Sequence, residues 1–282
     1  MHSAYAGEMW YIATVFFQPK TLAEALQHKA DLRQGGIFIA GGTDLVVLMN
    51  HGKEAPEHLI DLSHIQSLTE IRPRDGLIEL GGNVTFAQCA RLPVQCLSQA
   101  ALSVGGPGIR EIGTLAGNLA TASPAGDGST ALLALDAELE LRTARGMRRL
   151  RLTDFFLDYR KTALRPDEMI TKVFIPANYQ TAWAKAGKRG AVNISVAAAA
   201  AALTPERRVR IALASVAPTP IRCNGAEEFL SITGLNRESI LRATELVQVE
   251  VKPITDHRAS ADYKVHLSSV LVRRVLERLA SL

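Results

Sequence analysis

Two short glycine-containing segments carry the residue types that bind a phosphate group. The first reads Ala40-Gly41-Gly42-Thr43-Asp44 and the second reads Thr114-Leu115-Ala116-Gly117-Asn118. Glycine lets main-chain N–H groups approach an anion without a Cβ atom in the way, and threonine and asparagine add uncharged hydrogen bonds. One such loop would be weak evidence. Two of them, about 70 residues apart, predict a diphosphate held between two lobes of the protein.

Three charged residues near these loops have two interpretations each. Asp127 closes the segment Ser123-Pro124-Ala125-Gly126-Asp127. A carboxylate would repel a diphosphate, so it either accepts hydrogen bonds from ribose, ribityl or ring N–H groups or caps a helix that begins near Ser129. Asp44 has the same two interpretations, because it precedes an apolar stretch at residues 45–48. Lys185 either neutralises cofactor charge or is an ordinary solvated lysine.

The common nucleotide-binding and hydrolytic motifs do not occur in this sequence. There is no GxxxxGK segment followed by Ser or Thr, and Gly105-Gly106-Pro107-Gly108 does not fit GxGxxG. The seven histidines show no HExxH pattern, and Ser195 and Ser215 lie in apolar strands without a nucleophile elbow. A bound nucleotide is therefore expected in a fold other than the Rossmann or P-loop folds.

Composition and cysteine usage limit the class of protein. The chain has 282 residues, of which 47% are hydrophobic, and its net charge of +4 is a small difference between 32 basic and 28 acidic residues. With aromatic residues at only 5%, we expect no nucleic-acid partner. Cys89, Cys96 and Cys223 form no CxxC pair, so we expect reduced thiols and no iron–sulfur cluster, which needs about four cysteines.

No segment looks like a membrane anchor or a signal peptide. The longest apolar run, residues 196–203, is far shorter than the roughly 20 residues of a membrane helix. Residues 1–17 lack the basic start of a signal peptide. These features predict a soluble cytoplasmic protein without membrane insertion.

Local patterns predict three domains: residues 1–62, 63–176 and 177–282. In the first, Thr21 and Glu24 form a helix-starting capping box, and residues 37–40 and 58–62 are expected as buried strands. The second is expected to contain a strand at residues 77–80, a helix at 129–135, a hairpin of residues 138–142 and 149–152, and a strand ending at Pro176. We interpret the arginines of that hairpin as a solvated strand face.

The third domain contains an ambiguous run of six alanines. Propensity favours a helix there, but the following Thr204-Pro205-Glu206 segment resembles a turn before a return strand at residues 209–213. We therefore predict a hairpin whose small side chains allow close packing. The chain ends in an amphipathic helix with Leu267, Leu271 and Val275 on one face and Lys264 towards the other.

These residues resemble a known family. Ala40-Gly41-Gly42-Thr43-Asp44-Leu45 and Thr114-Leu115-Ala116-Gly117-Asn118-Leu119, continuing as Ser123-Pro124-Ala125-Gly126-Asp127, are similar to the loops of the FAD-binding medium subunit of molybdenum hydroxylases, a group that includes xanthine and carbon monoxide dehydrogenases. Ala217-Pro218-Thr219-Pro220-Ile221-Arg222-Cys223 and the C-terminal residues 258–274 also resemble segments of that family.

The resemblance implies an α+β protein: a two-lobed, vanillyl-alcohol-oxidase-like (PCMH-type) FAD-binding fold followed by a C-terminal α+β domain. It implies FAD contacts from two loops, with Asp127 at polar FAD atoms, Ile170 near the adenine or ring, and Lys185 near the flavin. The expected cofactor-binding residues are Ile37, Phe38, Ile39, Ala40, Gly41, Gly42, Thr43, Asp44, Thr114, Leu115, Ala116, Gly117, Asn118, Asp127, Ile170 and Lys185.

The family pattern has two glycines where this chain has Ala116-Gly117, so a methyl group must be accommodated beside the cofactor. Gly126 replaces the usual alanine, and Val104 lies where some relatives place a flavin-stacking phenylalanine.

The resemblance implies an oxidoreductase subunit that transfers electrons. Its partners would be a small subunit with 2Fe–2S clusters and a large molybdopterin subunit, with NAD or another molecule as electron acceptor; no catalytic acid–base residue or metal ligand is required of this chain. Two alternatives remain open: a stand-alone flavin oxidoreductase of the same fold, and a scaffold subunit that has lost its flavin.

Overall fold

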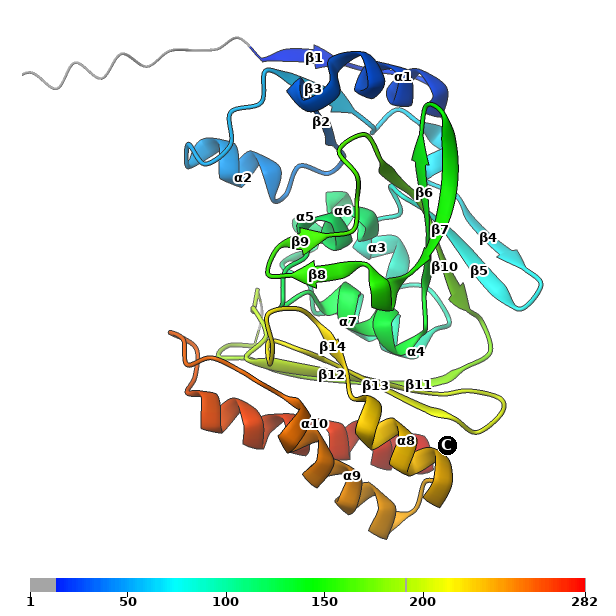
Figure 1. Cartoon of the computed structure of the whole chain (residues 1–282), viewed down its shortest axis with the longest axis vertical. Helices are drawn as coiled ribbons and strands as arrows, with labels where there is room; N and C mark the ends of the chain where they lie inside the picture. The colour runs from blue at the N-terminus through cyan, green and yellow to red at the C-terminus, as the bar shows by residue number, and fades with distance from the viewer. Residues whose placement is uncertain (1–13, 191, 282) are drawn as a thin grey trace, which may run out of the picture.

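The computed structural model describes residues 14–190 and 192–281. Most of the segment judged not to be a signal peptide lies outside them. Three sheets follow one another down the long axis of the molecule (Figure 1). The uppermost sheet has the parallel order β1-β3-β2 and is covered by the first helix. Its elements are β1 (Val15–Phe17), α1 (Leu22–Leu32), the 3-10 turn η1 (Arg33–Gly35), β2 (Gly36–Ile39), α2 (Leu45–Asn50) and β3 (His58–Asp61).

Several local predictions for this first unit are confirmed. The hydroxyl of Thr21 accepts the Glu24 N–H and the Glu24 carboxylate accepts the Thr21 N–H, which is the predicted capping box. The two predicted strands are β2 and β3, paired in parallel so that Ile37 lies opposite Leu59. Helix α2 extends to the side of this unit (Figure 1), and none of its residues is buried.

The central unit is a five-stranded antiparallel sheet, ordered β4-β5-β10-β6-β7, with five short helices packed against it. Here Leu80, Leu97, Leu115, Leu132 and Leu139 are fully buried in one core cluster. The unit comprises η2 (Gln66–Leu68), β4 (Ile71–Arg74), β5 (Leu77–Gly81), α3 (Phe86–Cys89), α4 (Gln95–Leu102), α5 (Pro107–Ile112), α6 (Leu115–Thr121), α7 (Asp127–Ala134), β6 (Glu138–Thr143), β7 (Gly146–Arg151), η3 (Leu152–Asp154), β8 (Phe156–Asp158), β9 (Lys161–Thr162) and β10 (Met169–Pro176).

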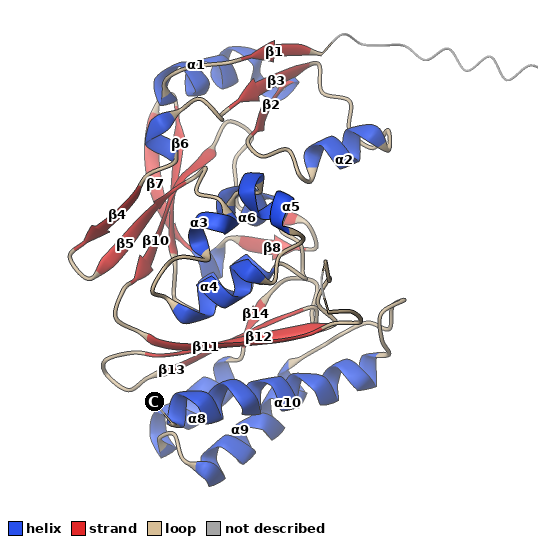
Figure 2. Cartoon of the chain, turned by 180° about the vertical axis from the view of Figure 1, so that it is seen from behind, coloured by secondary structure: helices blue, strands red, loops and turns tan. Residues whose placement is uncertain are grey.

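The third unit is a four-stranded antiparallel sheet, β11-β12-β13-β14, with helices on both faces. Figure 2 shows this sheet between α4 on one side and α8, α9 and α10 on the other. Its elements are β11 (Gln180–Ala186), β12 (Ala197–Leu203), β13 (Val209–Ala214), β14 (Ile221–Arg222), α8 (Asn224–Thr233), α9 (Arg237–Glu250) and α10 (Ala261–Ala280).

The alanine run forms the central strand β12, as the predicted hairpin requires. Successive side chains of a strand point to opposite faces. Accordingly Ala198 and Ala200 join the core cluster of the central unit, whereas Ala197 and Ala199 join the cluster beneath α10. Because a helix packs on each face, the small side chains allow both helix layers to approach the strand closely. Tertiary packing thus overrides the helical propensity of alanine.

Helix α7 connects the central and third units, and all eight of its residues are buried. It contacts β12 and β13, and its far end is held by Arg222, whose guanidinium donates to the Leu133 carbonyl at 3.1 Å and to Asp136. Near its start, the Ser215 N–H donates to the Pro124 carbonyl at 2.7 Å. The third unit therefore fixes both ends of α7. The domain boundaries after residues 62 and 176 stay a prediction.

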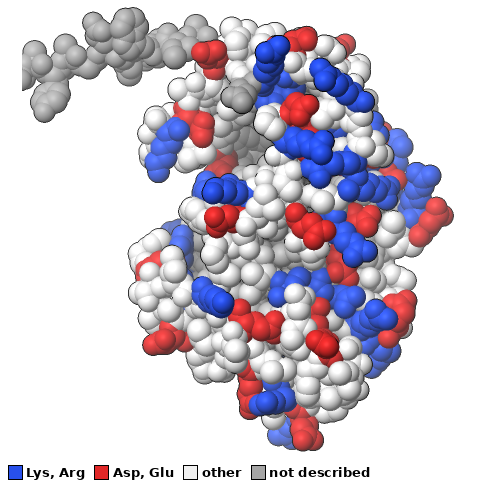
Figure 3. All heavy atoms as spheres, viewed as in Figure 1, with Lys and Arg blue, Asp and Glu red and all other residues white. Residues whose placement is uncertain are grey.

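Charged residues are interspersed over the face shown in Figure 3, and Lys and Arg are densest over α1 and the β6–β7 hairpin. Of the hairpin arginines predicted to be solvated, Arg149 and Arg151 are exposed and Arg142 is half-buried. Their neighbour Arg148 is also half-buried. Arg148 forms a bidentate pair with Glu168, whose side chain is only 3% exposed. Lys264, expected on the polar face of the last helix, is instead buried and bonded to Asp256 and the Ile254 carbonyl. No helix within the described residues is long and apolar enough to cross a membrane.

Candidate functional site

The first glycine loop presents a row of unpaired main-chain donors. Residues 41–44 follow β2 directly and are only partly buried. Among the described residues, the N–H groups of Gly41, Gly42, Thr43 and Asp44 have no hydrogen-bond acceptor. Gly42 has a φ of +65°, a conformation that glycine adopts at no steric cost. Consecutive free N–H groups in such a turn form a concave anion-binding surface.

The second loop begins helix α6 and contributes a further free donor. Thr114 is the N-cap residue, and its hydroxyl accepts the Gly117 N–H at 3.1 Å. The Leu115 N–H donates to the Val84 carbonyl at 2.9 Å, whereas the Ala116 N–H has no acceptor among the described residues. The Ala116 methyl group was expected beside the cofactor, and that expectation stays a prediction. That methyl belongs to the central core cluster, and the residue is 8% exposed.

The two loops touch each other, as the diphosphate prediction requires. A Cβ atom added to Gly41 would lie 1.8 Å from the carbonyl oxygen of Ile112, two residues before Thr114, and one added to Gly113 would lie 3.4 Å from the Thr43 hydroxyl. Only glycine fits at position 41. Two touching loops that each carry free N–H groups suit a diphosphate.

Asp127 is not a helix cap. Gly126 occupies the N-cap position of α7, and Asp127 is the first helical residue, 6% exposed. Its Oδ1 accepts the Ser195 hydroxyl at 2.7 Å, and its Oδ2 accepts the Ser103 hydroxyl at 3.2 Å and the ammonium of Lys185. Burial raises the pKa of the Asp127 carboxyl, and the Lys185 charge opposes that rise. The structure thus brings Asp127 and Lys185 together as a buried ion pair.

The remaining predicted positions are divided between the region around the loops and the interior. Asn118 accepts the Ser129 hydroxyl at 3.2 Å and so connects the second loop to α7. Asp44 stands at the N-cap position of α2 but makes no side-chain cap bond. The side chains of Leu115 and Ile170 are buried in the central core, at 0% and 5% exposure. Ile37, Phe38, Ile39 and Ala40 are partly buried along β2 and its end.

A cleft of about 660 Å³ adjoins the second loop. It is lined by Asn118, by residues 123–127 and by Val104, and it continues between the β8–β9 turn and the loops of the third unit. Ser103 and Ser195, the partners of Asp127, were not identified from the sequence as cofactor-site residues. No local pattern could have found them, since Ser195 lies 68 residues from Asp127.

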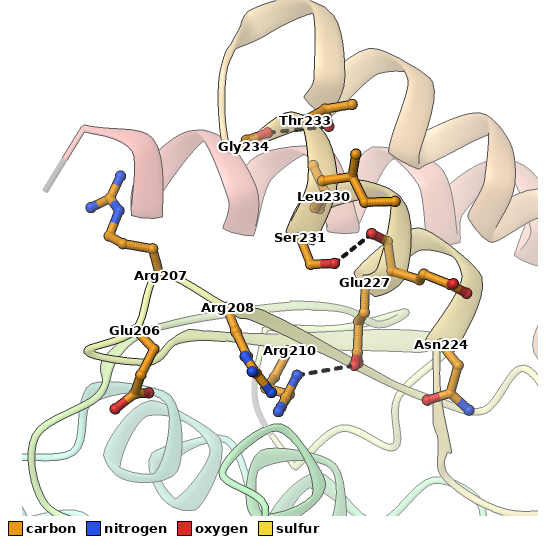
Figure 4. Close-up of a pocket in the computed structure, with 12 residues that line it drawn as sticks. Glu206, Arg207, Arg208, Arg210, Asn224, Glu227, Leu230, Ser231, Thr233 and Gly234 are labelled. Carbon is orange, nitrogen blue, oxygen red and sulfur yellow. Dashed lines mark hydrogen bonds and ion pairs between the residues drawn. The ribbon is translucent and has the colours of Figure 1, made fainter.

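A second hollow, of about 800 Å³, lies between the turn after β12 and helix α8 (Figure 4). It surrounds the first residues of β13, whereas Ser215, which lines the cleft, follows the last residue of that strand. The six residues of β13 therefore separate this hollow from the cleft beside the second loop by roughly 20 Å. The Glu227 carboxylate in this hollow accepts hydrogen bonds from the Ile211 N–H at 2.8 Å and from the Arg222 guanidinium at 2.6 Å. The charged groups there stabilise the fold and do not belong to the loop site.

Two family models match the chain. The model described as "FAD binding domain in molybdopterin dehydrogenase" matches residues 11–178, and the "CO dehydrogenase flavoprotein C-terminal domain" matches residues 182–279. The nicotinate dehydrogenase FAD-subunit of Eubacterium barkeri is 36% identical over 268 residues, which is 88% of this chain and 90% of the relative. A putative xanthine dehydrogenase FAD-binding subunit of Escherichia coli K12 is 30% identical over 275 residues, which is 93% of this chain and 94% of the relative.

Solved structures agree with these matches. The reconstituted CO dehydrogenase from Oligotropha carboxidovorans superposes with a TM-score of 0.88 at 28% identity, covering 94% of this chain and 97% of that chain. The predicted two-lobed FAD-binding fold with a C-terminal α+β domain is thereby confirmed. The chain belongs to the family of FAD-binding subunits of molybdenum hydroxylases. It is accordingly the flavoprotein subunit of an oxidoreductase, with FAD as its cofactor.

Proposed function

We propose that this chain is the electron-transfer subunit of a molybdenum hydroxylase complex. It takes electrons from 2Fe–2S clusters of a small partner subunit and passes them to NAD or another acceptor, while a large molybdopterin subunit hydroxylates the substrate. The observation that carries the proposal is the pair of touching loops, which have unpaired N–H groups at residues 41–44 and 116 among the described residues. The second loop adjoins a cleft through Asn118.

FAD, when bound, supplies the redox chemistry, and the protein supplies binding, orientation and electrostatics. We assign the diphosphate to the first loop, residues 37–44, and the second loop, residues 114–118. The main-chain N–H groups would stabilise the phosphate charge by hydrogen bonds, without a cationic side chain. The Thr43 hydroxyl would add one hydrogen bond. Ile170 is assigned to the adenine or ring region. The cleft beside Asn118 and Asp127 provides the space for the ribityl chain and ring.

The cations at the far part of the cleft favour an anionic acceptor such as NAD. Arg160 and Lys252 both line it. Among the described residues neither side chain has an ion-pair partner, unlike Arg258 and Lys264, which are both paired with Asp256. Unpaired cations beside a cleft attract an anionic ligand and raise its association rate.

The three cysteines are buried free thiols, and burial raises the pKa of Cys89 and Cys96 to about 12. We propose the cytoplasm as the place of action, because free cysteines in place of disulfides are typical of a reducing compartment. Buried thiols also leave the chain no means of holding a cluster, in keeping with clusters on a partner subunit.

The test is purification of the native complex with quantification of FAD, iron and molybdenum, followed by reoxidation of the substrate-reduced complex with NAD. We expect a visible flavin absorption band, stoichiometric iron and molybdenum, and formation of NADH. A flavin band without iron or molybdenum would support the stand-alone oxidoreductase instead. A chain that lacks the band and does not regain it with added FAD would be the flavin-free scaffold and would refute the proposal.

A further inference from the structure

The carboxylate of Asp127 is already occupied within the protein. The Ser195 hydroxyl and the Lys185 ammonium donate to its two oxygens. The Ser103 hydroxyl lies 3.2 Å from Oδ2 and shares its one hydrogen between that oxygen and the Ala100 carbonyl at 2.7 Å. A carboxylate has about four acceptor positions, so little of its capacity is left for a cofactor. Its surroundings are those of a buried counter-ion and not those of a residue that holds a ligand directly.

Lys185 is the cation of this cluster, and its side chain is 10% exposed. Its ammonium donates to Asp127 and, at 3.0 Å, to the main-chain carbonyl of Ser103. An ammonium has three donors, so one remains for another partner. The cluster adjoins the cleft, because Asp127 lines it together with Asn118 of the second loop.

We propose that Asp127, supported by Ser195, is a positioning residue that holds the Lys185 ammonium charged beside the flavin, so that Lys185 raises the flavin's reduction potential. This inference rests on the proposed function. Reduction adds negative charge to the flavin, and a fixed cation stabilises that charge more than it stabilises the neutral oxidised ring. The three contributing segments are distant in sequence: α7 carries Asp127, β11 carries Lys185, and the loop before β12 carries Ser195.

In the alternative role, the negative charge of Asp127 acts on the flavin directly. The two roles predict changes of opposite sign in the flavin reduction potential when Asp127 is replaced by Asn. A buried anion beside the flavin disfavours reduction, so its removal in Asp127→Asn would raise the potential. If Asp127 acts through Lys185, the same substitution leaves a buried ammonium without its counter-ion. Such an ammonium either loses its proton or moves to water, and in both cases the flavin loses the cation and the potential falls.

The experiment is a double-mutant cycle on the intact complex, with the flavin reduction potential measured by equilibration with redox dyes. We expect Lys185→Met and Asp127→Asn each to lower the reduction equilibrium constant by about tenfold or more, which is ~30 mV for a two-electron couple. In the Lys185→Met background, Asp127→Asn is expected to leave the potential nearly unchanged, because a buried carboxyl without its cation is neutral. This loss of the effect of Asp127→Asn is the result that a positioning role produces.

Lys185→Arg is the matched control. It keeps the positive charge, so the flavin reduction potential is expected to stay close to that of the unsubstituted complex. If Asp127→Asn does not fold, as judged by circular dichroism, Ser195→Ala replaces it and is expected to lower the potential by a smaller factor. The inference is overturned if Asp127→Asn raises the flavin potential while Lys185 is present, or if Lys185→Met by itself leaves the potential unchanged. Absence of FAD from the unsubstituted complex would instead refute the proposed function, so the two failures are distinguishable.

Discussion

The contact between the two loops gives a sharp prediction for Gly41→Ala. The added methyl would lie 1.8 Å from the Ile112 carbonyl oxygen, and ordinary van der Waals contact begins near 3.4 Å. One loop must therefore move away from the other by more than an ångström, which spoils the alignment of their N–H groups on a shared diphosphate. Hydrogen bonds to a charged group contribute about 1.5–3 kcal/mol each. Loss of two of them weakens FAD binding by about a hundredfold or more.

The overpacked contact also costs the apoprotein about 1–3 kcal/mol of unfolding free energy. We would measure the dissociation constant of FAD by fluorescence titration of the apoprotein, and stability by urea unfolding. Gly108→Ala is the matched control, because Gly108 belongs to the same helix as Ile112 and an added Cβ meets nothing within 4 Å. An FAD affinity unchanged in Gly41→Ala would refute the assignment of these two loops to one diphosphate.

Three further predictions concern stability and the second loop. Arg222→Met, which removes the bidentate partner of the buried Glu227 carboxylate, should cost about 3–5 kcal/mol in urea unfolding, whereas Arg242→Met, in an exposed pair, should cost at most about 1 kcal/mol. Hydrogen bonding to Arg148 lowers the pKa of Glu168 below 4.5, so the stability that this pair contributes is complete above pH 4.5 and is lost as the pH falls through the folded pKa. The free energy of unfolding of Arg148→Met should therefore depend less on pH in the acid range. An equal pH dependence in the two proteins would contradict the pairing of Arg148 with Glu168. Ala116→Gly should cost about 0.5–1 kcal/mol of stability without tightening FAD binding in the same titration, since its methyl faces the core; tighter binding would mean that the methyl obstructs the cofactor.

Local signals in the sequence were enough for several helices and strands. The capping box at Thr21, the hairpin of β6 and β7, and the strand closed by Pro176 all appear as predicted. Each depends on residues a few positions apart, whose side chains and backbone meet whatever the rest of the chain does. The same holds for the glycine loops, because the free N–H groups of residues 41–44 follow from a local turn.

The candidate site was predicted in outline but not in its contacts. Asp127 and Lys185 were both expected near the flavin, but no local pattern indicates that they pair with each other across 58 positions. The interpretation of Asp127 as a helix cap could be excluded only by seeing Gly126 in that position. The burial of Lys264 was likewise not predictable from α10 alone, because its ion-pair partner Asp256 belongs to the loop before that helix.

By itself, the sequence determined the residue types that can bind a diphosphate, the approximate positions of several helices and strands, and the family to which the motifs are similar. The tertiary structure alone decided which of these residues meet. It pressed Gly41 against Ile112, buried the alanine strand between two helix layers, and turned Asp127 towards Lys185 and Ser195. The physical reason is that contacts between distant segments depend on how whole elements pack, and no local pattern of residues records that packing.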